Sequence, residues 1–260
     1  MAPYDYETPA HAQRIFRRLV AARREQKGHE DVAVLDLCCS YGVNAALLNH
    51  ELTLRSLYER YCSDELDGVS SAELSRADRQ FFGQRRRPSA ARVLGVDSAA
   101  NAVRYAQEAG LLERGWSRNL EEEPPDAGLR AHLSRVDLVT VTGGIGYITE
   151  QTFARILGAR HDEHFPWVAA FALRWVDFSP IEAILADHGL VTEKWERRTF
   201  PQRRFTDSEE REYAISELRA RGIDPDGKES EGRFHAELYV ARPRADTGGT
   251  RLGDLFEGMV

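Results

Sequence analysis

Short apolar runs alternate with amphipathic segments along most of the chain. In the segment 9–27, Ile15, Leu19 and Ala22 fall on one face at helical spacing, which predicts an amphipathic helix. The strand-like runs, each short and bounded by polar residues, lie at 32–37, 91–97, 136–142, 167–175, 190–200 and 234–243. Because short strands that alternate with helices form parallel sheets covered on both faces, this order predicts an α/β fold.

One segment interrupts this alternation. Residues 50–88 contain two predicted helices, 54–61 and 71–82, and end in an arginine-rich loop. We therefore expect a single domain over residues 1–245 that carries a helical insertion at 50–88. The glycine-rich tail, 246–260, follows the last strand and is expected to be loosely held.

Composition narrows the class of protein. The chain has 260 residues and a net charge of −7, which argues against general nucleic-acid binding because that needs an excess of Lys and Arg. Its three cysteines include no C-x-x-C pair, which argues against a zinc site and fits a reducing cytoplasm. No apolar stretch is long enough to span a bilayer, and the first 18 residues lack a signal-peptide core. We therefore expect a cytoplasmic protein without a membrane or nucleic-acid partner.

The stretch "VLDLCCSYGV", residues 34–43, is the first candidate site. An apolar run ends near Asp36 and is followed by small residues and Gly42, while the next run ends in Asp97. In open α/β sheets, ligands bind outside the carboxyl ends of the strands, and small residues let a ligand approach the backbone closely. A carboxylate at the end of the second strand can accept hydrogen bonds from the two hydroxyls of a ribose.

These motifs resemble those of the class I S-adenosylmethionine-dependent methyltransferases, whose first motif is an acid followed by Gly-x-Gly-x-Gly. "LDLCCSYG" matches in frame, with Asp36 as the acid and Cys38, Ser40 and Gly42 at the glycine places. "VLGVDSAANAVRYA" resembles the second motif, with Asp97 as the ribose acid.

The resemblance extends roughly over residues 30–245 and implies a Rossmann-like, doubly wound, seven-stranded sheet whose last strand, 234–243, is antiparallel. It implies S-adenosylmethionine (SAM) as cofactor. The further residues it assigns to the cofactor site are Ser98, Asn119 and Leu120 beside the nucleoside, and Thr142 and Gly143 as the floor under the methyl donor.

The methyl acceptor is less constrained. The "[DN]PP[YF]" signature of amide and nucleobase methylation is absent, and "TGGIGY", 142–147, stands at the matching place. We therefore expect transfer to an oxygen or nitrogen of a small molecule, with Tyr147 facing the acceptor and Tyr6, in the segment "PYDY", on a lid. The segment "HDEH", 161–164, is not expected to bind a metal, because four neighbouring side chains in a loop rarely converge on one ion. His164 in this segment is instead a candidate general base for the acceptor.

A pair of arginines suggests a charge on the acceptor. Arg203 and Arg204 follow the predicted strand 190–200, and two adjacent guanidiniums can hold a carboxylate. An acidic acceptor is one interpretation, and a solvated basic strand end is the other.

Three alternatives stay open. The replaced glycines are compatible with a non-catalytic nucleoside-binding or protein-interaction module on the same fold. A nicotinamide-dependent oxidoreductase is less favoured, because "CSYGVN" supplies only one glycine of that fingerprint. The insertion 50–88 would serve as a lid, a substrate wall or the contact of a homodimer.

Overall fold

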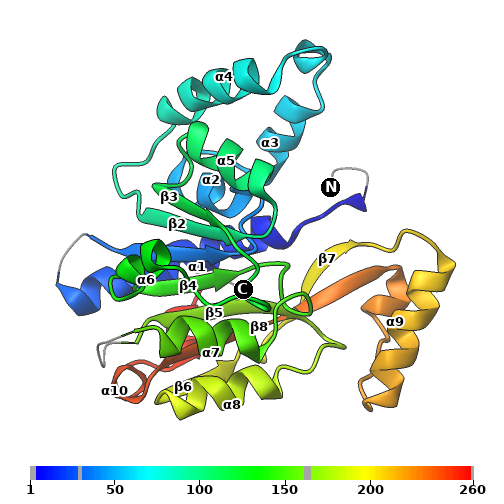
Figure 1. Cartoon of the computed structure of the whole chain (residues 1–260). Helices are drawn as coiled ribbons and strands as arrows, with labels where there is room; N and C mark the ends of the chain where they lie inside the picture. Colours follow the sequence, from blue (N-terminus) through cyan, green and yellow to red (C-terminus); the bar gives the residue numbers. More distant parts are fainter. Residues whose placement is uncertain (1–3, 29–30, 161–164, 259–260) are drawn as a thin grey trace.

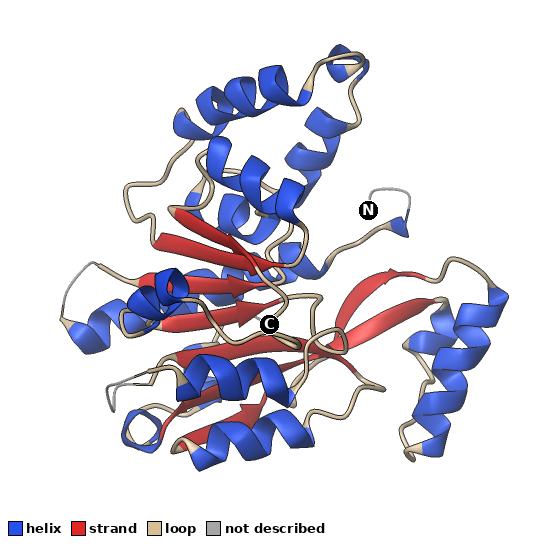
Figure 2. Cartoon of the chain, viewed as in Figure 1, coloured by secondary structure: helices blue, strands red, loops and turns tan. Residues whose placement is uncertain are grey.

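The protein forms one mixed sheet with helices on both faces (Figure 1; Figure 2), in a computed structural model that describes residues 4–28, 31–160 and 165–258. The strands of these residues are β1 (Ala33–Leu37), β2 (Arg92–Asp97), β3 (Arg114–Ser117), β4 (Leu138–Val141), β5 (Trp167–Leu173), β6 (Leu190–Lys194), β7 (Phe200–Arg204) and β8 (Arg233–Pro243). Their order is β3-β2-β1-β4-β5-β8-β6, and β7 pairs with β8. Strands β1 to β5 pair in parallel, whereas β8 is antiparallel to its neighbours, which confirms the predicted fold class and its antiparallel last strand.

Helices cover the sheet in two layers. The helices of the described residues are α1 (Thr8–Lys27), α2 (Val43–Asn49), α3 (Leu54–Tyr61), α4 (Ser71–Gly83), α5 (Ala100–Glu108), α6 (Ala127–Leu133), α7 (Glu150–Gly158), α8 (Ser179–Asp187), α9 (Ser208–Ala220), α10 (Arg244–Thr247) and α11 (Leu252–Leu255). Side chains alternate across each strand, so Val34 packs in the core with α1, α2 and α5 while Leu35 packs in the core with α6, α7 and α8. This alternation gives the sheet two apolar faces, and the parallel direction of β1 to β5 places their carboxyl ends at one edge of the sheet, where the candidate site lies.

The insertion stands over α2 and α5 as a separate pair of helices. Helices α3 and α4 lie at the top of Figure 1, beyond the β3 edge of the sheet. Each begins at a capping box, Thr53 with Ser56 in α3 and Ser70 with Glu73 in α4, so their starts are determined by local sequence.

The structure differs from the sequence predictions at one strand that was too long and at one strand that was not predicted. The run 190–200 is not one strand: the chain turns at Glu196–Arg197, and β7 begins at Phe200. The edge strand β3 was not predicted: the segment 98–115 was expected to be a helix that ends at Gly110 or Gly115, and α5 ends just before Gly110, which adopts φ +74°. Every residue of β3 is exposed or half-buried, so the sequence of this strand contains no apolar run that would predict it.

The expectation of a loosely held tail was also wrong. Phe256 is fully buried and packs against Trp195, with ring centroids 4.9 Å apart and the ring planes tilted by 45°. Arg18 of α1 donates a hydrogen bond of 3.0 Å to the carbonyl oxygen of Leu255. The apolar residues of this segment, rather than its glycines, determine how it is held.

Candidate functional site

The loop after β1 takes an unusual backbone conformation for its sequence. Cys38 and Ser40 have φ of +54° and +48°, and Gly42 has φ of +78°. Three alternate residues therefore lie in the left-handed region, which costs a residue with a side chain about 1–2 kcal/mol. Backbone strain held at the carboxyl end of a central strand is typical of a functional site.

Neighbouring glycines make room for the two cysteine side chains. A Cβ atom on Gly144 would lie 2.5 Å from Sγ of Cys38, and one on Gly95 would lie 2.7 Å from Sγ of Cys39. Burial raises the pKa of the Cys38 thiol to about 12, so this thiol is neutral at physiological pH. The Cys38 side chain, which stands at one of the usual glycine places, thus points into space left by Gly144, and the loop keeps its course.

Asp97, at the end of β2, holds this loop. Its Oδ2 accepts a hydrogen bond of 2.9 Å from the backbone N–H of Ser40, and its Oδ1 accepts one of 2.8 Å from that of Ala99. A carboxylate can accept about four hydrogen bonds, so both oxygens keep capacity for a ligand. The side chain therefore has the chemistry to bind a pair of hydroxyl groups beside the loop.

A cavity of about 160 Å³ lies between this loop and the loops that follow β3 and β4. Of the residues predicted for the cofactor, it is lined by Cys38, Asp97, Ser98, Asn119 and Leu120. The remaining lining residues are Leu37, Val96, Arg118, Tyr147, Ile148 and Thr152. One face of the cavity is therefore apolar, while the carboxylate lies at another.

Asp36 lies beneath the loop rather than in the cavity wall. Its buried carboxylate accepts hydrogen bonds of 3.0 Å from Nδ2 of Asn44 and 2.8 Å from Oγ1 of Thr140. Asn44 also donates to Oγ1 of Thr142 at 2.9 Å. Burial raises the pKa of Asp36 to about 7, with the two hydrogen bonds opposing the shift. Asp36 and Thr142 thus join β1, α2 and β4 below the site.

A second cavity, of about 320 Å³, lies on the other side of Tyr147. Tyr147 lines both cavities and is 85% exposed. At Gly143, a Cβ atom would lie 2.6 Å from the Tyr6 hydroxyl, so only glycine permits this approach. The complete lining of the second cavity is Tyr4, Tyr6, Gly143, Ile145, Tyr147, Phe171, Leu173, Gln202 and Arg203.

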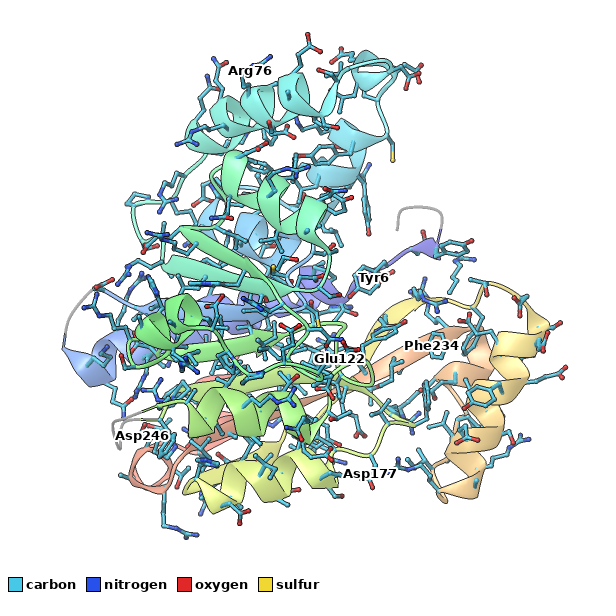
Figure 3. All side chains as sticks on the ribbon, in the orientation of Figure 1. Tyr6, Arg76, Glu122, Asp177, Phe234 and Asp246 are labelled. Atoms are coloured by element: carbon cyan, nitrogen blue, oxygen red, sulfur yellow. The ribbon has the colours of Figure 1, made fainter. Side chains whose placement is uncertain are left out.

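The N-terminal segment 4–7 crosses the second cavity. Figure 3 shows Tyr6 between the helical insertion and β7. The insertion holds it from one side, where the Tyr58 hydroxyl donates to the carbonyl oxygen of Tyr6 at 2.7 Å. From the other side, Arg233 donates to Glu7 at 2.9 Å. Burial raises the pKa of the Tyr6 phenol, so Tyr6 is a neutral hydrogen-bonding group.

The two arginines predicted to bind a substrate carboxylate are already paired within the protein. Arg203 forms two hydrogen bonds with Glu210, of 2.9 and 2.6 Å, and Arg204 forms one of 2.6 Å with Asp5. Arg203 lines the second cavity, but its charge is neutralised by Glu210. The acidic acceptor therefore loses the observation that suggested it. His164, the predicted base, lies outside the described residues.

Two positioning residues were not recognised in the sequence. Asn44 is a polar residue in the otherwise apolar run "VNAALL", which is the signal that could have found it. Glu121 accepts hydrogen bonds of 2.9 Å from the backbone N–H of Thr149 and 2.7 Å from its hydroxyl. Glu121 thereby joins the loop after β3 to the loop that carries Tyr147.

Neither a family model nor a curated protein sequence matches the chain. Among solved structures, it is similar to the magnesium protoporphyrin IX methyltransferase of Synechocystis PCC 6803 with bound SAM, at 14% identity over 89% of this chain and 80% of that one, with a TM-score of 0.41. A TehB-like SAM-dependent methyltransferase from Corynebacterium glutamicum is 14% identical over 91% and 98%, with a TM-score of 0.39. The plantazolicin methyltransferase BpumL, in complex with S-adenosylhomocysteine (SAH), is 10% identical over 92% and 86%, with a TM-score of 0.45.

All three names state a methyltransferase, and each mentions SAM or SAH. Likenesses this distant carry no argument about the reaction or the substrate, which depend on the site itself. Within the described residues, no helix is long and apolar enough to cross a membrane, and no group of three or more His, Cys, Asp or Glu side chains is placed to hold a metal ion.

Proposed function

We propose that this protein is a SAM-dependent methyltransferase that acts on an oxygen or nitrogen of a small molecule. The observation that carries the proposal is the loop 38–42, which keeps three alternate left-handed residues next to the Asp97 carboxylate although two of them are not glycine. Strain of this kind persists only where the surrounding structure imposes it, which is expected if a ligand must approach the backbone at this point.

The residues present fit the cofactor. The apolar wall of the smaller cavity, with Leu120 and Val96, suits the faces of an adenine ring, and Asn119 at its edge suits the ring nitrogens. Asp97 keeps acceptor capacity for the ribose hydroxyls. In this proposal, Asp36 and Asn44 position the loop from below and do not contact the cofactor.

When bound, SAM supplies a methyl group activated by a sulfonium. The protein's own task is then to hold the acceptor atom in line with that methyl group, because positioning supplies most of the rate in such a displacement. Tyr6 and Tyr147 would position the acceptor within the larger cavity through hydrogen bonds of their hydroxyl groups, beside Gly143. The segment 4–7 would exclude water from the acceptor.

The lining of the larger cavity favours an uncharged acceptor that carries a ring. Three tyrosines and Phe171 supply aromatic surface, and the guanidinium of Arg203 is engaged by Glu210. Aromatic side chains bind planar, apolar groups well, whereas an acidic group would need a cation with a vacant donor.

Calorimetric titration with SAH tests the cofactor. The wild-type chain should bind SAH, and Asp97→Ala should weaken that binding at least tenfold, because the ribose hydroxyls and the loop amide of Ser40 lose their acceptor. Glu122→Ala is the matched control: this exposed acid, labelled in Figure 3, lies in the loop after β3 that also carries Asn119 but does not line the cavity, so the affinity of this variant should equal that of the wild type.

Two results would contradict the proposal. If the folded wild-type chain binds no SAH but binds reduced nicotinamide cofactor, the site belongs to an oxidoreductase. If Asp97→Ala binds SAH as tightly as the wild type does, the assignment of the ribose to Asp97 is wrong. Retained SAH binding without methyl transfer to any of a panel of phenols and heteroaromatic amines would favour a non-catalytic module.

A further inference from the structure

A third cavity, of about 530 Å³, lies outside the candidate active site and is larger than either cavity within it. Its lining residues come from the insertion helices α3 and α4 on one side and from α2, α5 and their adjoining loops on the other; these four helices lie in the upper part of Figure 1. Its volume lies within the range of roughly 300–1,000 Å³ that is usual for small-molecule sites.

The walls of this cavity, which we call the insertion cavity, are largely apolar. The apolar residues that line it are Val43, Ala46, Leu57, Leu74, Phe82 and Leu111. Its polar lining includes Arg104 and Glu108, whose opposite charges lie one turn apart on α5, together with the tyrosines Tyr41 and Tyr61. Because the lining carries no net charge, its chemistry fits an uncharged and mainly apolar ligand.

A buried polar network joins the helices around the insertion cavity. Asp78 of α4 is completely buried and accepts hydrogen bonds of 3.0 and 2.7 Å from Arg60 and 2.9 Å from the Tyr61 hydroxyl, both on α3. Its other contact is the Tyr105 hydroxyl of α5. A network that joins three helices through one carboxylate fixes their spacing, so the cavity is kept open by directed bonds.

The insertion cavity also touches the loop proposed to bind SAM. Tyr41 lies between Ser40 and Gly42, lines the cavity, and packs its ring against Tyr105 with centroids 5.6 Å apart. A Cβ atom on Gly42 would lie 3.1 Å from Leu111, another residue of the cavity wall. A molecule in the cavity would therefore contact Tyr41, which belongs to the strained loop, and Leu111, which packs beside Gly42 of that loop.

We propose that the insertion cavity binds an uncharged, mainly apolar small molecule, and that its occupancy changes the affinity of the loop 38–42 for the methyl donor. The first half of the proposal, that the cavity binds such a ligand, depends on the cavity alone. The second half, that the ligand changes the affinity for the methyl donor, rests on the proposed function, since it requires that the loop bind SAM. Tyr41 and Leu111 are the residues through which the two sites are coupled, and the coupling is reciprocal by thermodynamic necessity.

Nile red, an uncharged apolar fluorophore, is the probe for the first half. Its fluorescence should rise and saturate on titration with the wild-type chain, and Leu74→Trp, which fills the cavity, should weaken binding at least tenfold. The control is Arg76→Trp, on the same helix but exposed and outside the lining; Figure 3 shows Arg76 on the outer side of α4. Leu74→Asp is the second variant, because half-buried Leu74 tolerates a polar side chain that still repels the probe.

Two outcomes would overturn the first half: no saturable signal with the wild-type chain, or unchanged affinity in both folded Leu74 variants. For the second half, the dissociation constant of SAH is measured with and without saturating Nile red, and we expect at least a threefold difference that Leu74→Trp abolishes. Equal constants would overturn the coupling. Failure of SAH to bind at all would overturn the proposed function and the coupling together, while the Nile red titration would still decide the cavity.

Discussion

The left-handed conformation of Ser40 makes a direct prediction about stability. Replacing Ser40 by glycine should stabilise the protein, although glycine usually destabilises. The reason is that Ser40 has φ of +48°, a region that glycine occupies without steric penalty. The hydrogen bond from the Ser40 backbone N–H to Asp97 is made by the main chain and survives the substitution.

The magnitude follows from two opposing effects. The left-handed conformation costs a residue with a side chain ~1–2 kcal/mol, which Ser40→Gly removes. Glycine also makes the unfolded chain more flexible, which lowers the free energy of unfolding by ~0.4–1 kcal/mol. We therefore expect a net gain of roughly 0.5–1 kcal/mol in the free energy of unfolding, or a rise in Tm of about 1–4 °C for a chain of this size. Ser40→Val should lose at least ~1 kcal/mol, because β-branched residues are rare outliers at positive φ.

Urea denaturation followed by tryptophan fluorescence measures the difference, provided that the m-values of the variants agree. Ser98→Gly is the matched control, since Ser98 is exposed and does not have positive φ; this variant should be neutral or slightly destabilised. If Ser40→Gly loses stability as Ser98→Gly does, or if Ser40→Val is tolerated as well as Ser40→Gly, then residue 40 does not hold a left-handed conformation. The argument for the loop would then be wrong.

Two further predictions test the layer below the site and the end of the chain. The raised pKa of Asp36, about 7 in place of 3.8, means that ionisation opposes folding; the penalty is absent below about pH 4 and fully present above pH 7. The free energy of unfolding of Asp36→Asn minus that of the wild type should therefore increase by ~4 kcal/mol from pH 4 to pH 8. Urea denaturation of both proteins at the two pH values measures this difference, and a difference that does not change with pH would contradict the raised pKa of the buried carboxyl group. Phe256→Ala should lose about 3 kcal/mol in urea denaturation because Phe256 is fully buried against Trp195, whereas a loss below ~0.5 kcal/mol would mean that the tail is loosely held.

The parts of the fold that could be predicted are those whose signal is local. The strands that pack against helices on both faces are continuous apolar runs, as in β1 and β5, where almost every residue is buried. The edge strand β3 has no such run, and its existence depends on pairing with β2. The division between β6 and β7 likewise depends on tertiary contacts, since β6 and β7 both pair with β8.

The same distinction between local signals and tertiary contacts applies to the residues of the candidate site. The position of Asp97 could be predicted, because the end of β2 follows from its apolar run, whereas Asn119 was assigned by the family resemblance alone, since β3 has no such run. The pairing of Arg203 with Glu210 could not, because a run of basic residues does not reveal which carboxylates the fold brings to it. The insertion cavity could not be predicted either, since it depends on how the hydrogen bonds of Asp78 space α3 and α4.

The replaced glycines of the loop illustrate why a motif cannot be judged from its own residues. A glycine in such a loop supplies both freedom at positive φ and space around its Cα atom. At Cys38 the space is supplied from across the site, because Gly144 lies so close that a Cβ atom on it would be 2.5 Å from the Cys38 Sγ atom; Gly95 leaves room in the same way for the neighbouring Cys39 side chain. The conformational freedom at positive φ is lost at Cys38 and Ser40, and contacts such as the hydrogen bond from the Ser40 backbone N–H to Asp97 offset that loss. A chain can therefore keep the shape of a glycine-rich loop with one glycine in it, provided that the glycines facing the loop are retained.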